Sequence, residues 1–261
     1  MNGVNQTLYI PLYGKAYVSK RGIILDDPKA EQIWEEQGFS LAGKSRSRWL
    51  AYYLGIRAAV FDDWLRQQME ELPDAVVIHI GCGLDSRVLR VGTMGHKWYD
   101  VDFAEVISER KRHYAESADY LMLAADVRES DWLAAISDSK SAIVVMEGVS
   151  MYLTPEELSV LTAQLSGRFG RLACLMDCYT ALAARLSKHK NPVRDMGVTE
   201  VYGTDDPADL EHDGFAYIKE HDMTPQQYIN RLQGMERWIF KTVYAGGVSR
   251  KLYRLFEYGG A

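Results

Sequence analysis

Apolar residues recur at helical spacing in the N-terminal part of the chain. Between Asp27 and Leu72 they return every three to four positions with few helix breakers, which predicts helical structure. Pro73 and Asp74 end this segment, and no flexible linker follows. We therefore expect residues 1–74 to form a helical cap on a larger unit rather than a separate domain.

Five short apolar runs follow, each separated from the next by a helical stretch. They lie within AVVIHIG (75–81), HKWYDVD (96–102), YLMLAAD (120–126), SAIVVMEG (141–148) and RLACLMDCY (171–179). A parallel sheet with helices on both faces has this strand–helix order and these apolar strands. We expect residues 75–179 to form the core of an α/β domain with a mostly parallel sheet.

The pattern changes after the fifth run. Prolines and glycines interrupt a polar stretch between Thr180 and Glu211, which predicts a helix followed by a loop-rich insertion. Two more strands, a hairpin-like pair with a helix around Pro225–Gly234 between them, are expected at GFAYIKEHD (214–222) and KLYRLFEYGG (251–260). Residues 180–261 would thus complete a seven-stranded sheet, and the whole chain 1–261 would be one domain.

The composition and net charge of the chain argue against nucleic acid and membranes as partners. The 261 residues are 47% hydrophobic and 25% charged, which is typical of a packed globular protein. The net charge of -6 gives no electrostatic attraction to nucleic acid or to anionic membranes, so we expect neither as a partner. No apolar run approaches the roughly 18 residues of a membrane span, and the N-terminus lacks a signal-peptide pattern.

The three cysteines indicate the redox environment in which the protein is expected to work. Cys82, Cys174 and Cys178 are odd in number and lack the spacing of zinc ligands. Cys174 and Cys178 would share one face of a strand, which predicts buried thiols. We expect a reducing, cytoplasmic location and no metal site.

A Gly-x-Gly turn, Gly81 and Gly83, ends the first strand. Ligands of open α/β sheets bind at the carboxyl ends of strands, and glycine lets the backbone come close to them. A dinucleotide fingerprint would have a third glycine near position 86, where this chain has Ser86. Asp85 stands where the next helix begins and is a poor neighbour for a pyrophosphate. By itself, the turn is equally compatible with a structural role.

Acidic residues end the next strands. Asp100 and Asp102 lie 19 and 21 residues after the first glycine, the spacing of an acid that binds a ribose diol. Asp102, the last residue of its strand, is the better candidate. Asp126 and Val127, after the third strand, can bind the amine and ring of adenine, and Glu147 ends the fourth strand. Acids repel phosphate, whereas S-adenosylmethionine has no phosphate and contains a sulfonium and an ammonium group.

Several segments resemble the leucine carboxyl methyltransferase and polyketide O-methyltransferase family. They are VVIHIGCGLDSR, WYDVDFAEVISERK, AADVRE, VVMEGVSMYLTPEEL, DDPKAEQIW, GIRAAVFDDWL and YGTDDPADL, and the resemblance runs from about Tyr13 to Leu210. It implies a Rossmann-like class I methyltransferase fold with a seven-stranded sheet. It also implies S-adenosylmethionine as the methyl donor and transfer to an oxygen, typically of a carboxylate.

The resemblance assigns donor-binding roles to the motif positions. Those positions are Gly81, Asp102 for the ribose, Asp126 with Val127 for the adenine, and Glu147 near the methionine end. Arg57 is similar to an arginine that holds the methionine carboxylate, although many relatives have a second arginine where this chain has Ala59. Lys15 is similar to a basic residue that reaches the donor. Cys82, Gly83, Asp85 and Asp100 complete the candidate donor site.

The acceptor side is less defined by sequence. Tyr152, just after the fourth strand, is a candidate for positioning the acceptor, with a structural role as the equal alternative. Substrate contacts are also expected in the helical cap and in the insertion. Aromatic candidates there are Trp49, Tyr52, Tyr53, Trp238, Phe240 and Tyr244, for which burial in the core is the commoner role.

These observations predict an S-adenosylmethionine-dependent O-methyltransferase that acts on a carboxylate or hydroxyl of a small-molecule or polyketide-like acceptor. An ionised carboxylate needs no strong general base, whereas a phenol or alcohol would need one, and no histidine is placed for that role. The alternatives are a protein C-terminal leucine carboxyl methyltransferase, an NAD-dependent oxidoreductase and a non-catalytic protein that binds S-adenosylmethionine.

Overall fold

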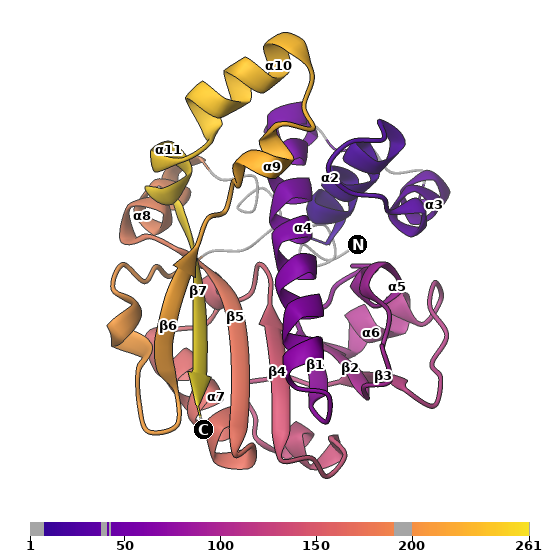
Figure 1. Cartoon of the computed structure of the whole chain (residues 1–261), viewed down its shortest axis with the longest axis vertical. Helices are drawn as coiled ribbons and strands as arrows, with labels where there is room; N and C mark the ends of the chain where they lie inside the picture. Colours follow the sequence, from indigo (N-terminus) through magenta and orange to yellow (C-terminus); the bar gives the residue numbers. More distant parts are fainter. Residues whose placement is uncertain (1–7, 38–40, 42, 191–199, 261) are drawn as a thin grey trace.

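The computed structural model describes residues 8–37, 41, 43–190 and 200–260, and its strands form one seven-stranded sheet (Figure 1). The strand order is β3-β2-β1-β4-β5-β7-β6. Strands β1 to β5 are parallel, and β7 runs antiparallel to both β5 and β6. The strands are β1 (Val76–Ile80), β2 (Trp98–Asp102), β3 (Tyr120–Ala124), β4 (Ser141–Met146), β5 (Arg171–Tyr179), β6 (Ala216–His221) and β7 (Tyr253–Gly260). The predicted seven-stranded, mostly parallel sheet is therefore confirmed.

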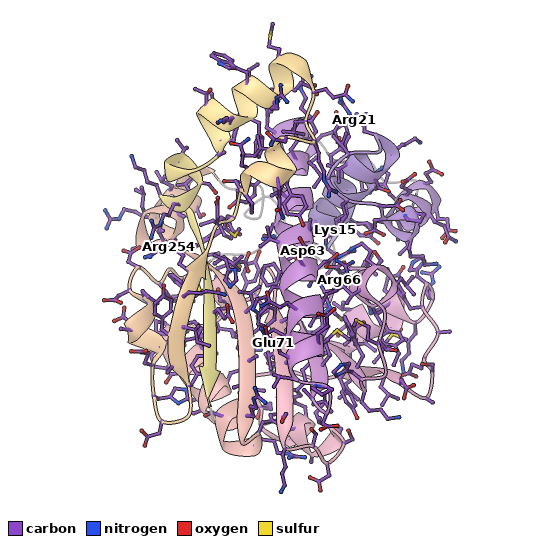
Figure 2. All side chains as sticks on the ribbon, in the orientation of Figure 1. Lys15, Arg21, Asp63, Arg66, Glu71 and Arg254 are labelled. Atoms are coloured by element: carbon purple, nitrogen blue, oxygen red, sulfur yellow. The ribbon has the colours of Figure 1, made fainter. Side chains whose placement is uncertain are left out.

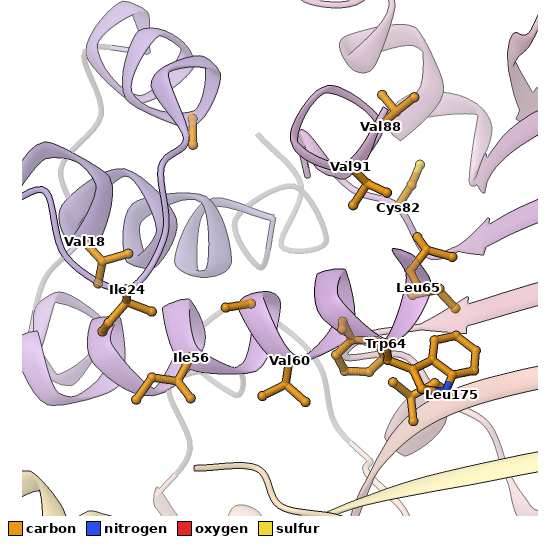
Figure 3. Packing of buried hydrophobic residues seen from close by; sticks show 14 of the residues in the cluster. Val18, Ile24, Ile56, Val60, Trp64, Leu65, Cys82, Val88, Val91 and Leu175 are labelled. Carbon is orange, nitrogen blue, oxygen red and sulfur yellow. The ribbon is translucent and has the colours of Figure 1, made fainter. Parts of the chain in front are cut away.

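Helices cover both faces of this sheet, as predicted. On one face, α4 packs Ile56, Val60 and Trp64 into the same apolar cluster as Leu175 of β5 (Figure 3). On the other face, Leu158 and its neighbours on α7 join the opposite side of the strands. The helices are α2 (Tyr9–Lys20), α3 (Pro28–Glu36), α4 (Arg48–Glu71), α5 (Arg87–Val91), α6 (Ala104–Arg110), α7 (Pro155–Arg168), α8 (Ala181–Lys190), α9 (Gln226–Ile229), α10 (Gly234–Ile239) and α11 (Gly247–Arg250).

The N-terminal part differs from the prediction. The helical structure is broken, because α3 ends at Glu36 and α4 begins only at Arg48 after a 3-10 turn at Gly43–Arg46. Helix α2 lies within the predicted cap but before residues 27–72, the stretch in which a helical period was identified. It is buried on most of its circumference, so it has no single apolar stripe, and it contains Pro11 and Gly14. Its sequence therefore lacks the helical period that identified α4.

Close packing holds α2 against α4. A Cβ on Gly14 would lie 2.9 Å from Leu54 Cβ, and a Cβ on Gly55 would lie 2.7 Å from Val18 Cγ2. Two glycines, one on each helix, thus allow an approach that larger residues would prevent. Lys15 lies between Gly14 and Val18 in α2, so this contact fixes its position (Figure 2).

The C-terminal part has more helix than expected. One helix was predicted around Pro225–Gly234, but α9 is followed by α10, a π-helical turn at Phe240–Tyr244 and α11 before β7 begins. The helix predicted after the fifth strand is present as α8, and residues 191–199 of the insertion lie outside the described residues.

Two further sequence expectations concern the whole chain. All three cysteines are buried and free. Within the described residues, no helix has both the length and the apolar character needed to cross a bilayer.

Candidate donor-binding site

A cavity of about 830 Å³ lies at the carboxyl ends of the parallel strands. Its lining includes Gly81 after β1, Asp102 at the end of β2 and Glu147 after β4. It also continues to Tyr179 at the end of β5 and Tyr253 at the start of β7. This volume is within the range of about 300 to 1,000 Å³ that is usual for small-molecule sites.

The Gly-x-Gly turn brings β1 against the loops after β2 and β4. Gly81 and Gly83 have positive φ angles of 65° and 50°. A Cβ on Gly81 would lie only 2.2 Å from Val149 Cγ2, so no other residue fits there without movement. Gly83 donates its N–H to Asp102 Oδ2 at 2.8 Å. The turn thus fixes the carboxylate that was predicted to bind a ribose.

Asp102 is positioned by backbone donors on both oxygens. Its Oδ1 accepts the N–H of Phe103 at 2.8 Å. Burial raises the pKa of Asp102, and the N–H groups of Gly83 and Phe103 oppose that rise. The carboxylate lines the cavity and can still accept further hydrogen bonds, because each oxygen has two lone pairs.

A buried charge cluster surrounds the turn on the β4 side. It consists of Lys15, Asp85, Arg87, Arg90 and Glu147. Lys15 Nζ lies 2.7 Å from Asp85 Oδ2 and 3.7 Å from Glu147 Oε1. Arg90 lies 2.7 Å from Asp85, and Arg87 forms an ion pair with Glu147. The side chain of Lys15 is only 3% exposed, so it is not a solvated surface lysine.

The cluster keeps both of its acids ionised. Burial opposes ionisation of Glu147, but Lys15, Arg57 and Arg87 outweigh it and lower its pKa to about 2. Burial likewise opposes ionisation of Asp85, and Arg90, Lys15 and Arg87 hold its pKa well below the usual range. The lining therefore presents carboxylates next to an ammonium group. This mixture is complementary to an amino-acid zwitterion and unfavourable to a pyrophosphate.

Arg57 reaches the cavity from α4. Its Nε donates to Glu147 Oε1 at 3.1 Å and its Nη1 donates to Asp177 Oδ2 at 2.8 Å. Asp177, in β5, also accepts the N–H of Gly148 at 2.6 Å. Arg57 thus lies next to Glu147 as the resemblance implies, and its role toward a methionine carboxylate stays a prediction.

Of the remaining candidates for donor binding, three line the cavity and one does not. Asp126, Val127 and Cys82 line the cavity, and Asp126 forms an ion pair with Arg128. The structure places Asp100 outside the cavity, contrary to the prediction. Asp100 is fully buried and accepts from Tyr120 and Trp98, and it forms an ion pair with Arg110.

Asp100 lies elsewhere because of its depth in the strand. Asp100 and Asp102 share one face of β2, but Asp100 is one pleat further from the carboxyl edge. Burial opposes its ionisation, and Arg110 together with His79 outweighs burial and lowers its pKa to about 2. It therefore anchors α6 to the sheet through Arg110.

The acceptor-side candidates separate into two groups. Tyr152, which is 40% exposed, and Tyr53 line the cavity. The other aromatic candidates lie outside the lining: Trp49 stacks on Tyr244, the Tyr52 hydroxyl donates to Glu236, Phe240 is buried in the core and Trp238 is exposed.

Sequence reasoning missed several residues of the site. Tyr179, Tyr253 and Asp177 are in or next to strands that were predicted, and Arg87 and Arg90 follow the glycine turn. The signal for Asp177 was an acid inside the apolar run RLACLMDCY, because a buried acid requires a partner. Nothing in the sequence pairs it with Arg57, 120 positions away.

Residues 11–166 match the sequence profile of a family described as leucine carboxyl methyltransferase. Two curated proteins are similar along most of their length. "Tetracenomycin polyketide synthesis O-methyltransferase TcmP" of Streptomyces glaucescens is 27% identical and covers 99% of this chain and 97% of its own. "S-adenosyl-L-methionine-dependent methyltransferase dpfgK" of Gibberella zeae is 27% identical, covering 81% of this chain and 78% of its own. The resemblance found in the motifs is confirmed.

Solved structures show the same fold. Magnesium protoporphyrin IX methyltransferase of Synechocystis, crystallised with bound S-adenosylhomocysteine, superposes with a TM-score of 0.54 at 13% identity, covering 95% of this chain and 97% of that chain. A duf574 family protein of Streptomyces avermitilis has a TM-score of 0.62 at 8% identity and covers 90% of each chain. The Rossmann-like methyltransferase fold predicted from the sequence is therefore confirmed.

Proposed function

The chain belongs to the leucine carboxyl methyltransferase family and is an S-adenosylmethionine-dependent methyltransferase, and on this premise we propose that it methylates an oxygen atom of a small-molecule acceptor. The observation that supports this most is the extent of the cavity. It continues past Glu147 to the ends of β5 and β7, which leaves room beside the candidate donor residues for a second molecule. The name of the Streptomyces glaucescens relative, a polyketide O-methyltransferase, supports oxygen as the acceptor atom.

We assign the donor as follows. Asp102 accepts from the ribose hydroxyls, and Asp126 with the backbone of Val127 binds the adenine. Lys15, Arg57, Asp85 and Glu147 surround the amino-acid end. These two cations and two carboxylates can contact the carboxylate and the ammonium group of the donor's methionine part. Gly81 and Gly83 place no side chain in this path, and their positive φ angles favour glycine at both positions.

In this reaction the protein mainly has to hold the acceptor oxygen and the donor methyl group in position. When bound, S-adenosylmethionine supplies an electrophilic methyl group: the acceptor oxygen forms the O–CH₃ bond while the S–CH₃ bond breaks and its electron pair stays on sulfur. The residues of the cavity hold the acceptor oxygen in line and exclude water. A carboxylate acceptor, which we favour, is ionised at neutral pH and requires no general base. We assign acceptor contact to Tyr152, which lines the cavity.

A methyl-transfer assay with labelled donor tests this proposal. The purified protein is incubated with a panel of aromatic and aliphatic carboxylic acids and, in a separate arm, with a protein phosphatase catalytic subunit. We expect label in an alkali-labile ester of a small acid. Label in an alkali-stable ether would shift the acceptor to a hydroxyl group. Label at the C-terminal leucine of the phosphatase would overturn the small-molecule assignment.

Two alternatives from the sequence have less support. An oxidoreductase would place the pyrophosphate of NAD beside Asp85 and Glu147, which are both ionised. A non-catalytic binding protein predicts donor binding without transfer to any acid of the panel. The free, buried cysteines support the proposal of a reducing compartment such as the cytoplasm.

A further inference from the structure

Five tyrosines of the described residues line the cavity, and three of them pack on one another on the side away from the candidate adenosine residues. We call these three the phenol subsite: Tyr53 on α4, Tyr179 at the end of β5 and Tyr253 at the start of β7. In the sheet, β5 and β7 follow β4, whereas β2 and β3 lie on the opposite side of β1. The phenol subsite is therefore separated from Asp102 and Asp126 by the width of the central strands.

The rings of the phenol subsite pack on one another. The centroids of Tyr179 and Tyr253 are 4.5 Å apart with planes at 88°, and those of Tyr53 and Tyr253 are 6.0 Å apart. The guanidinium of Arg57 lies 6.0 Å from the Tyr253 ring centroid. Because Arg57 also contacts Glu147, these rings extend directly from the methionine end of the candidate donor site. The edge-to-face contact of Tyr179 with Tyr253 and the tilted contact of Tyr53 with Tyr253 fix these rings more firmly than isolated side chains.

The hydroxyl groups of Tyr53 and Tyr253 are protonated at neutral pH and can act as hydrogen-bond donors. Burial raises the pKa of Tyr53 and of Tyr253. The Tyr53 oxygen accepts from Ser249 Oγ at 3.2 Å, so its own O–H is left to donate. A molecule with carbonyl, carboxylate or phenolate oxygens would supply acceptors for these groups.

Apolar side chains flank the phenol subsite on the side away from the Arg57–Asp177 ion pair. Met151 packs against Tyr179 and Tyr253, and Leu50 and Leu54 of α4 also line the cavity. The cations among the described lining residues are each in ion pairs with carboxylates: Lys15 with Asp85, Arg57 with Asp177 and Arg128 with Asp126. Recognition here therefore depends on aromatic contact and on hydrogen bonds from phenols.

We propose that the phenol subsite orients the methyl acceptor and that this acceptor is a flat aromatic molecule with oxygen substituents. The inference rests on the proposed function and goes further, because it names the shape of the acceptor and the positioning residues. Aromatic rings of the acceptor pack on the tyrosine rings, while the hydroxyl groups hold its oxygens and turn one of them toward the donor.

Calorimetry with two probe acids tests the inference. 1-Hydroxy-2-naphthoic acid and octanoic acid are titrated into the full chain saturated with S-adenosylhomocysteine. We expect the naphthoic acid to bind at least about tenfold more tightly, because only it can pack on the rings. The variants Tyr53→Phe, Tyr179→Phe and Tyr253→Phe keep the rings and remove one hydroxyl each. Loss of a hydrogen bond should weaken naphthoic acid binding by about two- to tenfold in at least two of them.

A matched control separates this effect from a general loss of structure. Tyr99 lies outside the cavity lining, and its hydroxyl accepts the N–H of Ser137 at 3.0 Å. Tyr99→Phe should leave naphthoic acid affinity unchanged. All four variants should bind S-adenosylhomocysteine as the parent does. With an acceptor that the enzyme methylates, the three substitutions in the phenol subsite should each raise KM by a larger factor than they lower kcat.

The outcomes distinguish the inference from the proposed function. Equal binding of the two acids, no binding of either, or unchanged naphthoic acid affinity in all three variants would overturn the phenol subsite. A parallel loss of S-adenosylhomocysteine affinity would do the same, since the tyrosines would then belong to the donor site. Tyrosine-dependent binding of the naphthoic acid without methyl transfer to any aromatic acid would instead count against the proposed function and leave the subsite standing.

Discussion

At the scale of single residues, Gly81 is the position where the end of β1 packs against Val149 in the loop after β4. Its φ of 65° and the 2.2 Å separation between a built Cβ and Val149 Cγ2 both oppose any side chain. We expect Gly81→Ala to destabilise the fold by about 1 to 3 kcal/mol or more and to weaken donor binding. Gly92→Ala is the matched control, because Gly92 has a φ of 80° but no atom within 4 Å.

Thermal unfolding and titration with S-adenosylhomocysteine separate the two variants. Gly92→Ala should lower the melting temperature through backbone strain alone and leave donor affinity unchanged. Equal effects of the two substitutions on donor affinity would show that the contact between Gly81 and Val149 does not contribute to donor binding.

Asp85 tests the buried charge cluster. It contacts Lys15 and Arg90 at 2.7 Å each, so Asp85→Ala leaves two buried cations without this partner. We expect donor affinity to fall by about tenfold or more, as judged from the cost of breaking buried pairs. Asp138→Ala, which removes an exposed carboxylate, is the control and should change nothing. Unchanged donor affinity together with a lower melting temperature would leave Asp85 with a structural role only.

The residues that sequence could identify are those with a local signal. Gly81, Asp102 and Glu147 each stand at the end of a predicted strand, and all three line the cavity. Asp100 has the same signal and lies elsewhere, because the alternation of a strand does not report depth. Ion pairs such as Arg57 with Asp177 join residues that are far apart in sequence and become visible only in the fold.

At the scale of elements, the contact between α2 and α4 sets the position of Lys15. A Cβ on Gly55 would lie 2.7 Å from Val18 Cγ2 on α2. We expect Gly55→Val to displace α2, move Lys15 away from Asp85 and weaken donor binding as well as stability. Calorimetric titration and thermal unfolding measure the two effects.

Gly167→Ala is the control for a helix glycine. Gly167 is exposed on α7, and nothing lies within 4 Å of a built Cβ. This substitution should stabilise the protein by about 0.5 to 1 kcal/mol and leave donor affinity unchanged. If Gly55→Val retained full donor affinity, the close helix contact would not control Lys15.

The strands could be predicted well and the helices less well. Each strand is a short apolar run bounded by turn residues, so its signal is local. Helix α7 also has a local signal, because Thr154 is its N-cap, Pro155 is its first residue and Glu157 completes a capping box with Thr154. Helix α2 has no amphipathic period because tertiary contacts bury most of it, and that burial depends on α4.

At the scale of the whole molecule, the ionised acids make stability dependent on pH. The pKa of Glu147 falls from an ordinary value of 4.5 to about 2 on folding. Its contribution to stability is therefore fully present above about pH 4.5 and is lost as the pH falls toward 2. Asp102 and Asp177 have raised pKa values and act in the opposite direction.

Urea unfolding at pH 7, 5, 4 and 3 measures this dependence. We expect the free energy of unfolding of the parent to decrease between pH 5 and pH 3. Glu147→Gln should be less stable at pH 7 and should lose less over the same interval, since the titrating group is absent. Parallel pH profiles of the two proteins would contradict the assignment of this effect to Glu147.

The division of the chain at positions 74 and 179 stays a prediction. Both the helical cap and the C-terminal strands contribute to this cavity, through Lys15 and Arg57 on one side and Tyr253 on the other. The family match at 11–166 covers the cap and the strands up to α7. Described residues from the cap to the last strand therefore form one site.

Calorimetric titration of that site with S-adenosylhomocysteine, S-adenosylmethionine and NAD is the most direct test. We predict that both sulfur compounds bind once per chain, that NAD does not bind, and that Asp102→Ala weakens the binding of both by about tenfold or more, because it removes the acceptor for the ribose hydroxyls. Binding of NAD without binding of either sulfur compound, or full affinity in Asp102→Ala, would contradict the account.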